Sequence, residues 1–155
     1  MSDERPELPA NEPALPGARI LVVSARWNGK IVGELKAGAL ERLKLAGVHV
    51  EEIEVPGSLE IPVAAAIKLD QGNYDGVVAL GCVIRGETEH FNIVAHQSAR
   101  ALMGLAVERK VALGNGILTV DNEAQAWERA DRAKGNAGGA AAAAALALAR
   151  LARNK

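Results

Sequence analysis

The stretch from Tyr74 to Lys110 constrains the fold more than any other part of the chain. It opens with an apolar, β-branched run that ends at Leu80, which is typical of a strand buried on both faces. Apolar residues then recur at helical spacing from Ile93 to Lys110, which predicts a long helix. Residues 85–89 therefore join a buried strand to a helix, and open α/β sheets bind their ligands at such junctions.

The junction itself carries a polar sequence with two open interpretations. Gly86 allows close backbone approach, and the N–H groups of Glu87, Thr88 and Glu89 lack helical partners, so that the helix start attracts phosphate. His90 follows, and imidazole exchanges protons near neutral pH. Together these features predict a phosphate cradle beside a proton shuttle. The alternative is a plain turn in which Thr88 caps the helix and His90 is an exposed surface residue.

The rest of the chain continues the alternation of strands and helices. Further strands are predicted at 19–24, 48–55 and 111–120, the last interrupted by Gly114-Asn115-Gly116. Further helices are predicted at 31–46 and 59–69, from Asp121 or Asn122 to 130, and, after a Gly-rich turn at 131–139, at 140–153. This order predicts an α/β fold of three αβα layers and flavodoxin-like type, in which one four-stranded parallel sheet has helices on both faces.

Composition narrows the class of protein further. The 155 residues suit one domain, predicted at 18–155, and residues 1–17 hold four of the six prolines and predict a flexible N-terminal arm. With 18 basic and 19 acidic side chains, no basic face for nucleic acid is expected. No apolar run is long enough for a bilayer, and no signal peptide is expected. The single cysteine, Cys82, excludes an internal disulfide and predicts a small core residue in a cytoplasmic protein.

Three loops are predicted at the carboxyl ends of the first three strands, at residues 27–28, 56–60 and 86–90. The carboxyl ends of parallel strands share one edge, so these loops can form one pocket. Trp27 could stack on a flat heterocycle there, or it could simply shield the sheet end. Glu60 could accept hydrogen bonds from a polyol or an amine, or it could be a first-turn acid favoured by the helix dipole.

The remaining chemistry-bearing residues give weaker signals. Arg129 could clamp a phosphate with two hydrogen bonds, although a lone helical arginine is more often a solvated surface residue. His96 lies six residues after His90, so the two do not share a helix face and a zinc pair is not expected. Neither a glycine-rich nucleotide motif nor a metal-spaced set of Cys and His occurs in the sequence.

Several separated motifs, taken together, resemble the 6,7-dimethyl-8-ribityllumazine synthases, which catalyse the penultimate step of riboflavin biosynthesis. The resemblance runs from Ala18 to the C-terminus. The motifs that carry it are Arg26-Trp27-Asn28, Pro56-Gly57-Ser58-Leu59-Glu60-Ile61-Pro62, Gly81 to Phe91, Gly116-Ile117-Leu118-Thr119, and Glu128-Arg129-Ala130 before Lys134-Gly135-Asn136. Enzymes of this family condense 5-amino-6-(D-ribitylamino)uracil with 3,4-dihydroxy-2-butanone 4-phosphate, without metal or organic cofactor.

The resemblance implies how the pyrimidine substrate is held. Trp27 takes the place of the aromatic residue that stacks on the pyrimidine. The segment that matches the ribityl-binding loop is Ser58, Leu59 and Glu60. The strand end whose backbone binds the uracil edge is matched by Cys82, Val83 and Ile84.

The resemblance also implies how the phosphate substrate is held and where protons move. Glu87 and Thr88 match the helix start that receives the butanone phosphate, and His90 matches the catalytic proton donor. Arg129 matches a residue that holds the phosphate, and Lys134 lies in a turn where members of the family carry lysines at differing places.

The family assembles as homopentamers with active sites between subunits, alone, paired or closed into an icosahedral shell. Asn115 and Arg129 match positions that reach into the site from a neighbouring subunit, although many members carry Phe at the position of Asn115. Three other functions remain open from the sequence: a flavin or lumazine receptor without turnover, a structural shell protein, and the structurally related riboflavin synthase of archaeal type.

Overall fold

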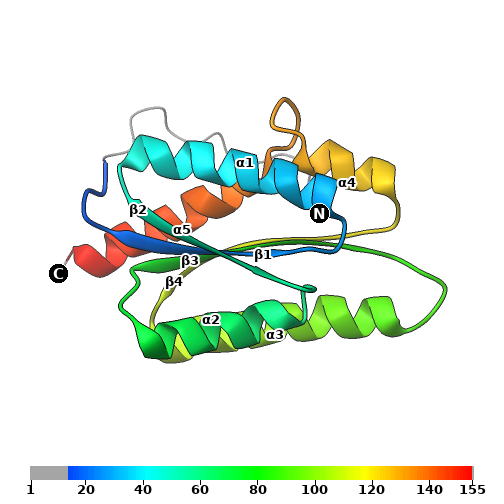
Figure 1. Cartoon of the computed structure of the whole chain (residues 1–155), viewed down its shortest axis with the longest axis horizontal. Coiled ribbons are helices and arrows are strands. Elements are labelled where there is room, and N and C mark those ends of the chain that lie inside the picture. Colours follow the sequence, from blue (N-terminus) through cyan, green and yellow to red (C-terminus); the bar gives the residue numbers. More distant parts are fainter. Residues whose placement is uncertain (1–13, 155) are drawn as a thin grey trace.

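The computed structural model describes residues 14–154. Four strands and five helices alternate along this part of the chain, and the sheet is parallel with the order β2-β1-β3-β4 (Figure 1). In chain order the elements are β1 Arg19–Ala25, α1 Gly29–Ala46, β2 His49–Val55, α2 Glu60–Gln71, β3 Gly76–Ile84, α3 His90–Arg109, β4 Ala112–Val120, α4 Glu123–Ala130 and α5 Ala137–Arg153.

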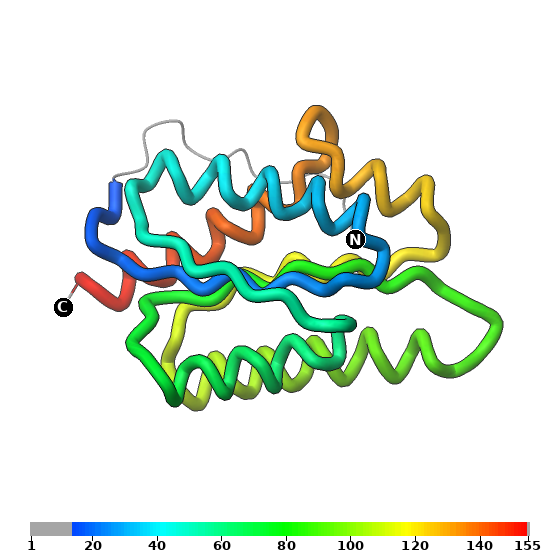
Figure 2. Tube along the Cα trace, viewed as in Figure 1, coloured from blue at the N-terminus to red at the C-terminus, as the bar shows by residue number. Residues whose placement is uncertain are grey.

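The sheet is the middle of three layers. Helices α1, α4 and α5 cover one face, and α2 and α3 lie together on the other, as the Cα trace shows (Figure 2). The predicted three-layer, four-stranded parallel fold is confirmed.

The central strands β1 and β3 are buried on both faces and feed two separate cores. In β1, Ile20 and Val22 face the core beneath α1 and α5, whereas Leu21 and Val23 face the core above α2 and α3. This two-sided burial explains why these strands appear in the sequence as continuous apolar runs rather than alternating ones.

Three helices begin earlier than their apolar periodicity indicates. α1 begins at Gly29 rather than at residue 31, α3 at His90 rather than at 93, and α5 at Ala137 rather than at 140. In α1 the two residues before the predicted start are exposed, so they carry no periodic signal, whereas α3 and α5 already bury Phe91 and Ala137 before their predicted starts. Side-chain caps mark the starts of two helices: Asn136 before α5 accepts a hydrogen bond from the N–H of Gly139, and Asn122 before α4 accepts one from the N–H of Gln125.

The predicted interruption of the fourth strand is wrong. Residues Gly114, Asn115 and Gly116 stay in parallel register with β3 (residues 78–80), and β4 runs unbroken. The glycines serve packing instead of a turn, because a Cβ at Gly114 would collide with the carbonyl group of Ala141 in α5. The small side chains of the Ala-rich helix α5 complete this close contact with the sheet.

The N-terminal arm predicted at residues 1–17 lies mostly outside the described residues. Of its last residues, Leu15 is buried in the core beneath α1, and its N–H donates to the carbonyl of Ala46 at 2.8 Å. This contact places Leu15 with the packed domain.

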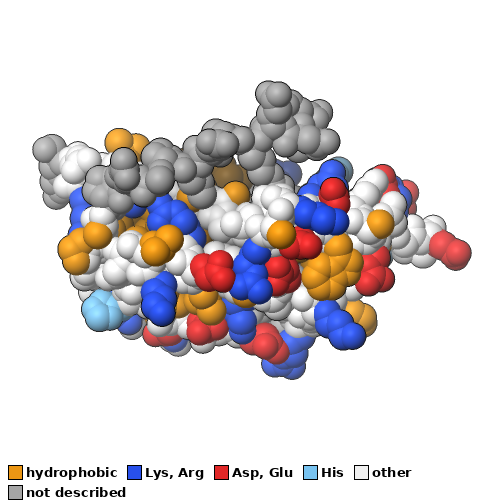
Figure 3. All heavy atoms as spheres, turned by 90° about the horizontal axis from the view of Figure 1, so that it is seen from above, with side chains coloured by type: hydrophobic (Ala, Val, Ile, Leu, Met, Phe, Trp, Pro, Cys, Tyr) orange, Lys and Arg blue, Asp and Glu red, His pale blue; other side chains and the backbone are white. Residues whose placement is uncertain are grey.

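The charged side chains are intermixed on the surface. Seen from the α1 side, basic and acidic groups alternate between scattered apolar ones (Figure 3). Within residues 14–154, no helix is both long enough and apolar enough to cross a bilayer.

We predict that Gly114→Ala destabilises the fold by about 1–3 kcal/mol, because the added methyl group forces β4 and α5 apart. The apparent unfolding midpoint in urea measures the change. Gly33→Ala is the matched control, since Gly33 lies exposed in α1 with open space around its Cβ position. That variant should be unchanged or more stable by up to about 1 kcal/mol. Equal midpoints for the two variants would contradict the close β4–α5 contact.

Candidate active site

A pocket of about 460 Å³ opens at the carboxyl edge of the sheet. Its walls come from the loops after β1 and β2, the end of β3, and the first turns of α3. The lining residues are 27–28, 57–60, 82–84, 86, 88, 90, 91 and 94. The three loops that the sequence predicted to share an edge therefore share one pocket.

The floor of the pocket is tied together by the turn after β1. Asn28 adopts a left-handed conformation with a φ of 60°, and its side-chain amide donates to the carbonyl of Cys82 in β3 at 2.8 Å. The N–H of Trp27 donates to the carbonyl of Pro56 at 3.2 Å. These two bonds hold the ends of three strands together. The indole of Trp27 is 72% exposed at the rim of the pocket, where its ring can accept a flat ligand.

Two glycines make room for the polar groups along one wall. A Cβ at Gly81 would collide with the hydroxyl oxygen of Ser58, which is buried. A Cβ at Gly57 would lie 3.2 Å from a carboxylate oxygen of Glu60 and 3.3 Å from Cδ1 of Trp27. Ser58 and Glu60 thus come close to the sheet end and to the indole, as a site for a hydroxylated chain requires.

Cys82 lines the pocket but is only 3% exposed. Burial, together with the negative charge of Glu123, raises the pKa of its thiol to about 11. At neutral pH the group is a neutral thiol, so it forms part of an apolar wall and does not act as a nucleophile.

The segment between β3 and α3 carries the predicted phosphate cradle and His90. His90 is the first residue of α3, is exposed, and lines the pocket. Its backbone N–H donates to the hydroxyl of Thr88 at 3.3 Å, and Thr88 also lines the pocket. Thr88 therefore both caps the first amide of the helix and lines the pocket. A role as helix cap, one of the two interpretations of this segment, thus does not exclude a role in binding.

Three of the predicted site residues do not line the pocket within one chain. Glu87 is exposed beside it. Asn115 lies in the middle of β4 opposite Ala79, several residues before the carboxyl end of the strand, and its side chain accepts from the N–H of Ile117 at 3.0 Å. Arg129 lies on α4, where Nη1 donates to the carbonyl of Gln125 at 3.1 Å.

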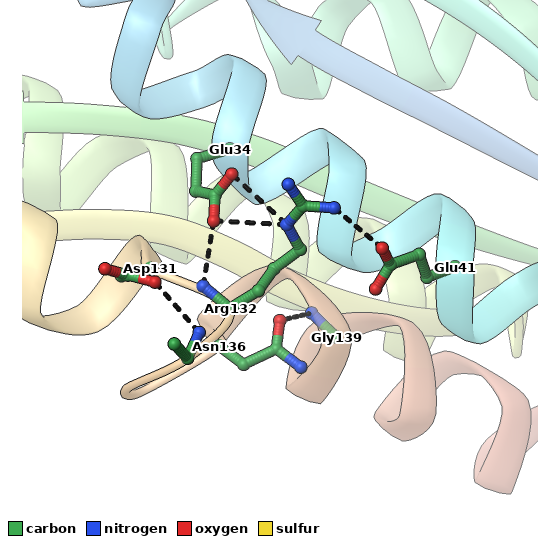
Figure 4. A network of polar contacts seen from close by, with 7 residues as sticks. Glu34, Glu41, Asp131, Arg132, Asn136 and Gly139 are labelled. Atoms are coloured by element: carbon green, nitrogen blue, oxygen red, sulfur yellow. Dashed lines mark hydrogen bonds and ion pairs between the residues drawn. The ribbon is translucent and has the colours of Figure 1, made fainter.

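The turn that follows Arg129 is fixed to α1 by a network around Arg132 (Figure 4). Its backbone N–H and its Nε donate to Glu34, and its Nη1 donates to Glu41 at 2.6 Å. The hydrogen bonds from Arg132 hold the pKa of Glu34 below its usual value. Lys134, in the same turn, pairs with Glu128 at 3.2 Å. The end of α4 that presents Arg129 is therefore held in one position.

Sequence reasoning missed parts of the pocket that depend on contacts between distant segments. It assigned no role to the side chain of Asn28, although an Asn-Gly pair after a strand signals a left-handed turn. It also left out Phe91 and Val94, which share the pocket-facing side of α3 with His90.

Within residues 14–154, no group of three or more His, Cys, Asp or Glu side chains could hold a metal ion.

Comparison with known proteins gives a consistent result. The family model of 6,7-dimethyl-8-ribityllumazine synthase matches residues 17–153. The 6,7-dimethyl-8-ribityllumazine synthase of Methylobacterium radiotolerans is 62% identical over 127 residues, which cover 82% of this chain and 77% of the relative. That of Azorhizobium caulinodans is 53% identical over 149 residues, which cover 93% of this chain and 91% of the relative. The 6,7-dimethyl-8-ribityllumazine synthase 1 of Rhodopseudomonas palustris is 49% identical over 158 residues, which cover 99% of this chain and 97% of the relative.

We predict that Cys82 reacts slowly with iodoacetamide, about 100-fold more slowly near pH 8 than a free cysteine, because its raised pKa leaves little thiolate. The rate, followed by mass spectrometry, should keep rising about tenfold per pH unit up to about pH 10. A rate that levels off below about pH 9 would contradict the neutral thiol inferred for this wall.

Proposed function

This chain belongs to the 6,7-dimethyl-8-ribityllumazine synthase family, and we propose that the pocket at the carboxyl edge of its sheet is where its reaction takes place. The enzyme condenses 5-amino-6-(D-ribitylamino)uracil with 3,4-dihydroxy-2-butanone 4-phosphate to form 6,7-dimethyl-8-ribityllumazine, the penultimate step of riboflavin biosynthesis. The observation that carries the proposal is that Trp27, from the loop after β1, and His90, from the first turn of α3, line one pocket.

The pyrimidine substrate is assigned to the half of the pocket between β1 and β2. Trp27 stacks on the ring, and Ser58, Leu59 and Glu60 hold the ribityl chain. The uracil edge is bound at the end of β3 by Cys82, Val83 and Ile84. The close approach permitted by the glycines at 57 and 81 supports this assignment, because it brings hydroxyl, carboxylate and indole groups to one wall.

The phosphate substrate is assigned to the start of α3. Thr88 and Glu87 supply the backbone amides of the helix start, where anions are favoured. Arg129 of a neighbouring subunit completes the phosphate site, and Asn115 of that subunit lines the pyrimidine. The position of Arg129 and Asn115 away from the pocket of their own chain supports a shared site.

The reaction needs proton transfers rather than strong nucleophiles. The amine of the pyrimidine condenses with the ketone to an imine and releases water, inorganic phosphate then leaves, and ring closure releases a second water. His90 relays protons in these steps. Binding both substrates side by side supplies most of the remaining acceleration, because it turns a bimolecular reaction into a unimolecular one.

The proposed shared site requires a homo-oligomer, for which we take the pentamer of the family. The outer face of α2 and α3 supports this part of the proposal, because it exposes a group of large apolar side chains. They are Val63 and Ile67 on α2, and Ile93, Met103 and Val107 on α3. Such a patch is typical of a surface that another protein covers. A cytoplasmic location completes the proposal, and the unpaired thiol of Cys82 suits it.

We predict that His90→Ala lowers kcat by about 10²–10⁴-fold while the KM values change little, because the side chain moves protons and does not anchor substrate. Formation of the fluorescent lumazine from the two substrates measures the rate. His96→Ala is the matched control: this histidine is also exposed on α3 but does not line the pocket, so its rate should stay unchanged. A wild-type chain that binds lumazine without forming it would instead be a receptor.

We predict that Arg129→Ala raises the KM for the phosphate substrate more than the KM for the pyrimidine.

We further expect hybrid assemblies of His90→Ala and Arg129→Ala subunits, refolded or expressed together, to regain activity. If His90 and Arg129 come from different subunits, about a quarter of random hybrid sites hold both intact residues. If both residues act within one chain, no hybrid site is intact and mixing restores nothing.

A further inference from the structure

Arg85 makes a set of contacts that the assignments above do not use. It is the first residue after β3, and its backbone N–H donates to the carbonyl of Val120 at the end of β4, at 2.8 Å. Its side-chain Nε donates to Asp121 at 2.8 Å. Its guanidinium carbon lies 4.5 Å from the ring centroid of Phe91. One side chain thus links the ends of β3 and β4 to the first turn of α3.

The contact with Phe91 connects Arg85 to the pocket without placing it there. Phe91 lines the pocket and directly follows His90 in the first turn of α3. Arg85 does not line the pocket, its side chain is 53% exposed, and its Nε is already paired with Asp121. The guanidinium therefore stacks on Phe91 rather than presenting itself to a substrate.

The rest of the segment has few other anchors. In the described part of the chain, the side-chain hydrogen bonds of Thr88 and Glu89 go to the first turn of α3, to His90 and Asn92. The space around the Cβ position of Gly86 is open. Figure 1 shows this connection extending past the layered body of the domain before it turns back into α3. Among the described residues, the hydrogen bonds that link residues 85–89 to the end of β4 are thus those of Arg85.

We propose that Arg85 is a positioning residue for the reaction: held by Asp121 and stacked on Phe91, it fixes the turn that presents His90 to the pocket. The proposal rests on the proposed function, because it gives Arg85 its effect through His90. It assigns Arg85 no contact with either substrate.

The first test compares the kinetics of Arg85→Ala, Arg85→Lys and a control. We expect Arg85→Ala to lower kcat by roughly 10-fold to 100-fold, since a misplacement of about 1 Å at a reacting group has effects of that size. The KM for the pyrimidine should stay within about twofold, because its wall is untouched. Arg85→Lys keeps the ion pair but loses the flat stacking surface, so its kcat should lie between those of the wild-type enzyme and Arg85→Ala. Arg109→Ala is the control, since it removes another short ion pair, with Asp70 at 2.6 Å, at the other end of α3.

A double variant separates positioning from other roles. If Arg85 acts through His90, Arg85→Ala should change the residual rate of the His90→Ala enzyme by less than about twofold. A full 10-fold further loss in that background would overturn the proposal. So would an effect of Arg85→Ala confined to the KM for the phosphate substrate, which would make Arg85 a ligand of the anion.

Hydrogen exchange tests the same inference without any turnover. In the intact assembly, peptides that cover residues 86–94 should exchange faster in Arg85→Ala than in wild type, while peptides of β1 and β3 stay unchanged. Unchanged exchange at 86–94 would overturn the proposal even if the wild-type enzyme is active. An inactive wild-type chain whose variant still shows faster local exchange would instead tell against the proposed function alone.

Discussion

The two-sided burial of β1 and β3 is the constraint on which the rest of the molecule depends. Both strands are apolar on both faces, so they take the centre of the sheet and require a helical layer on each side. Parallel pairing then brings the carboxyl ends of neighbouring strands to one edge. The loops that leave these carboxyl ends therefore lie next to one another. Their polar and aromatic residues line the pocket.

The shape of the pocket is set largely by backbone geometry. The left-handed Asn28 turns its amide onto the carbonyl of Cys82, which links the loop that carries Trp27 to the end of β3. Gly81 leaves the space that the hydroxyl of Ser58 occupies. The pocket side chains of this wall are thus held at the ends of strands, whereas His90 lies on a segment with few anchors of its own. This contrast gives the ion pair and stacking of Arg85 their importance under the proposed function.

The sequence was sufficient to predict the order of elements, the parallel sheet and the edge at which the pocket lies, because each depends on local apolar patterns. It failed where contacts with a segment distant in the sequence determine the local structure. Gly114 and Gly116 look like a turn locally, and only the approach of Ala141 in α5 explains them as strand residues. The amide of Asn28 has no partner until β1 and β3 are side by side. Most of the individual site residues came from the resemblance of several motifs to one family, since each position alone allows a structural explanation.

Under the proposed function, the placement of Arg129 would join assembly to catalysis. A chain that carries Trp27 and His90 on one pocket lacks a strong cation among the lining residues of that pocket, although a phosphate substrate calls for one. Arg129 lies instead on α4, and the following turn is fastened to α1 by the hydrogen bonds of Arg132 to Glu34 and Glu41. A cation on a helix whose end is fastened in this way, and that is absent from its own pocket, is suited to serve a neighbour. Completing the phosphate site by association would then make each subunit active only within the assembly, so that the apolar face of α2 and α3 and the chemistry of His90 depend on each other.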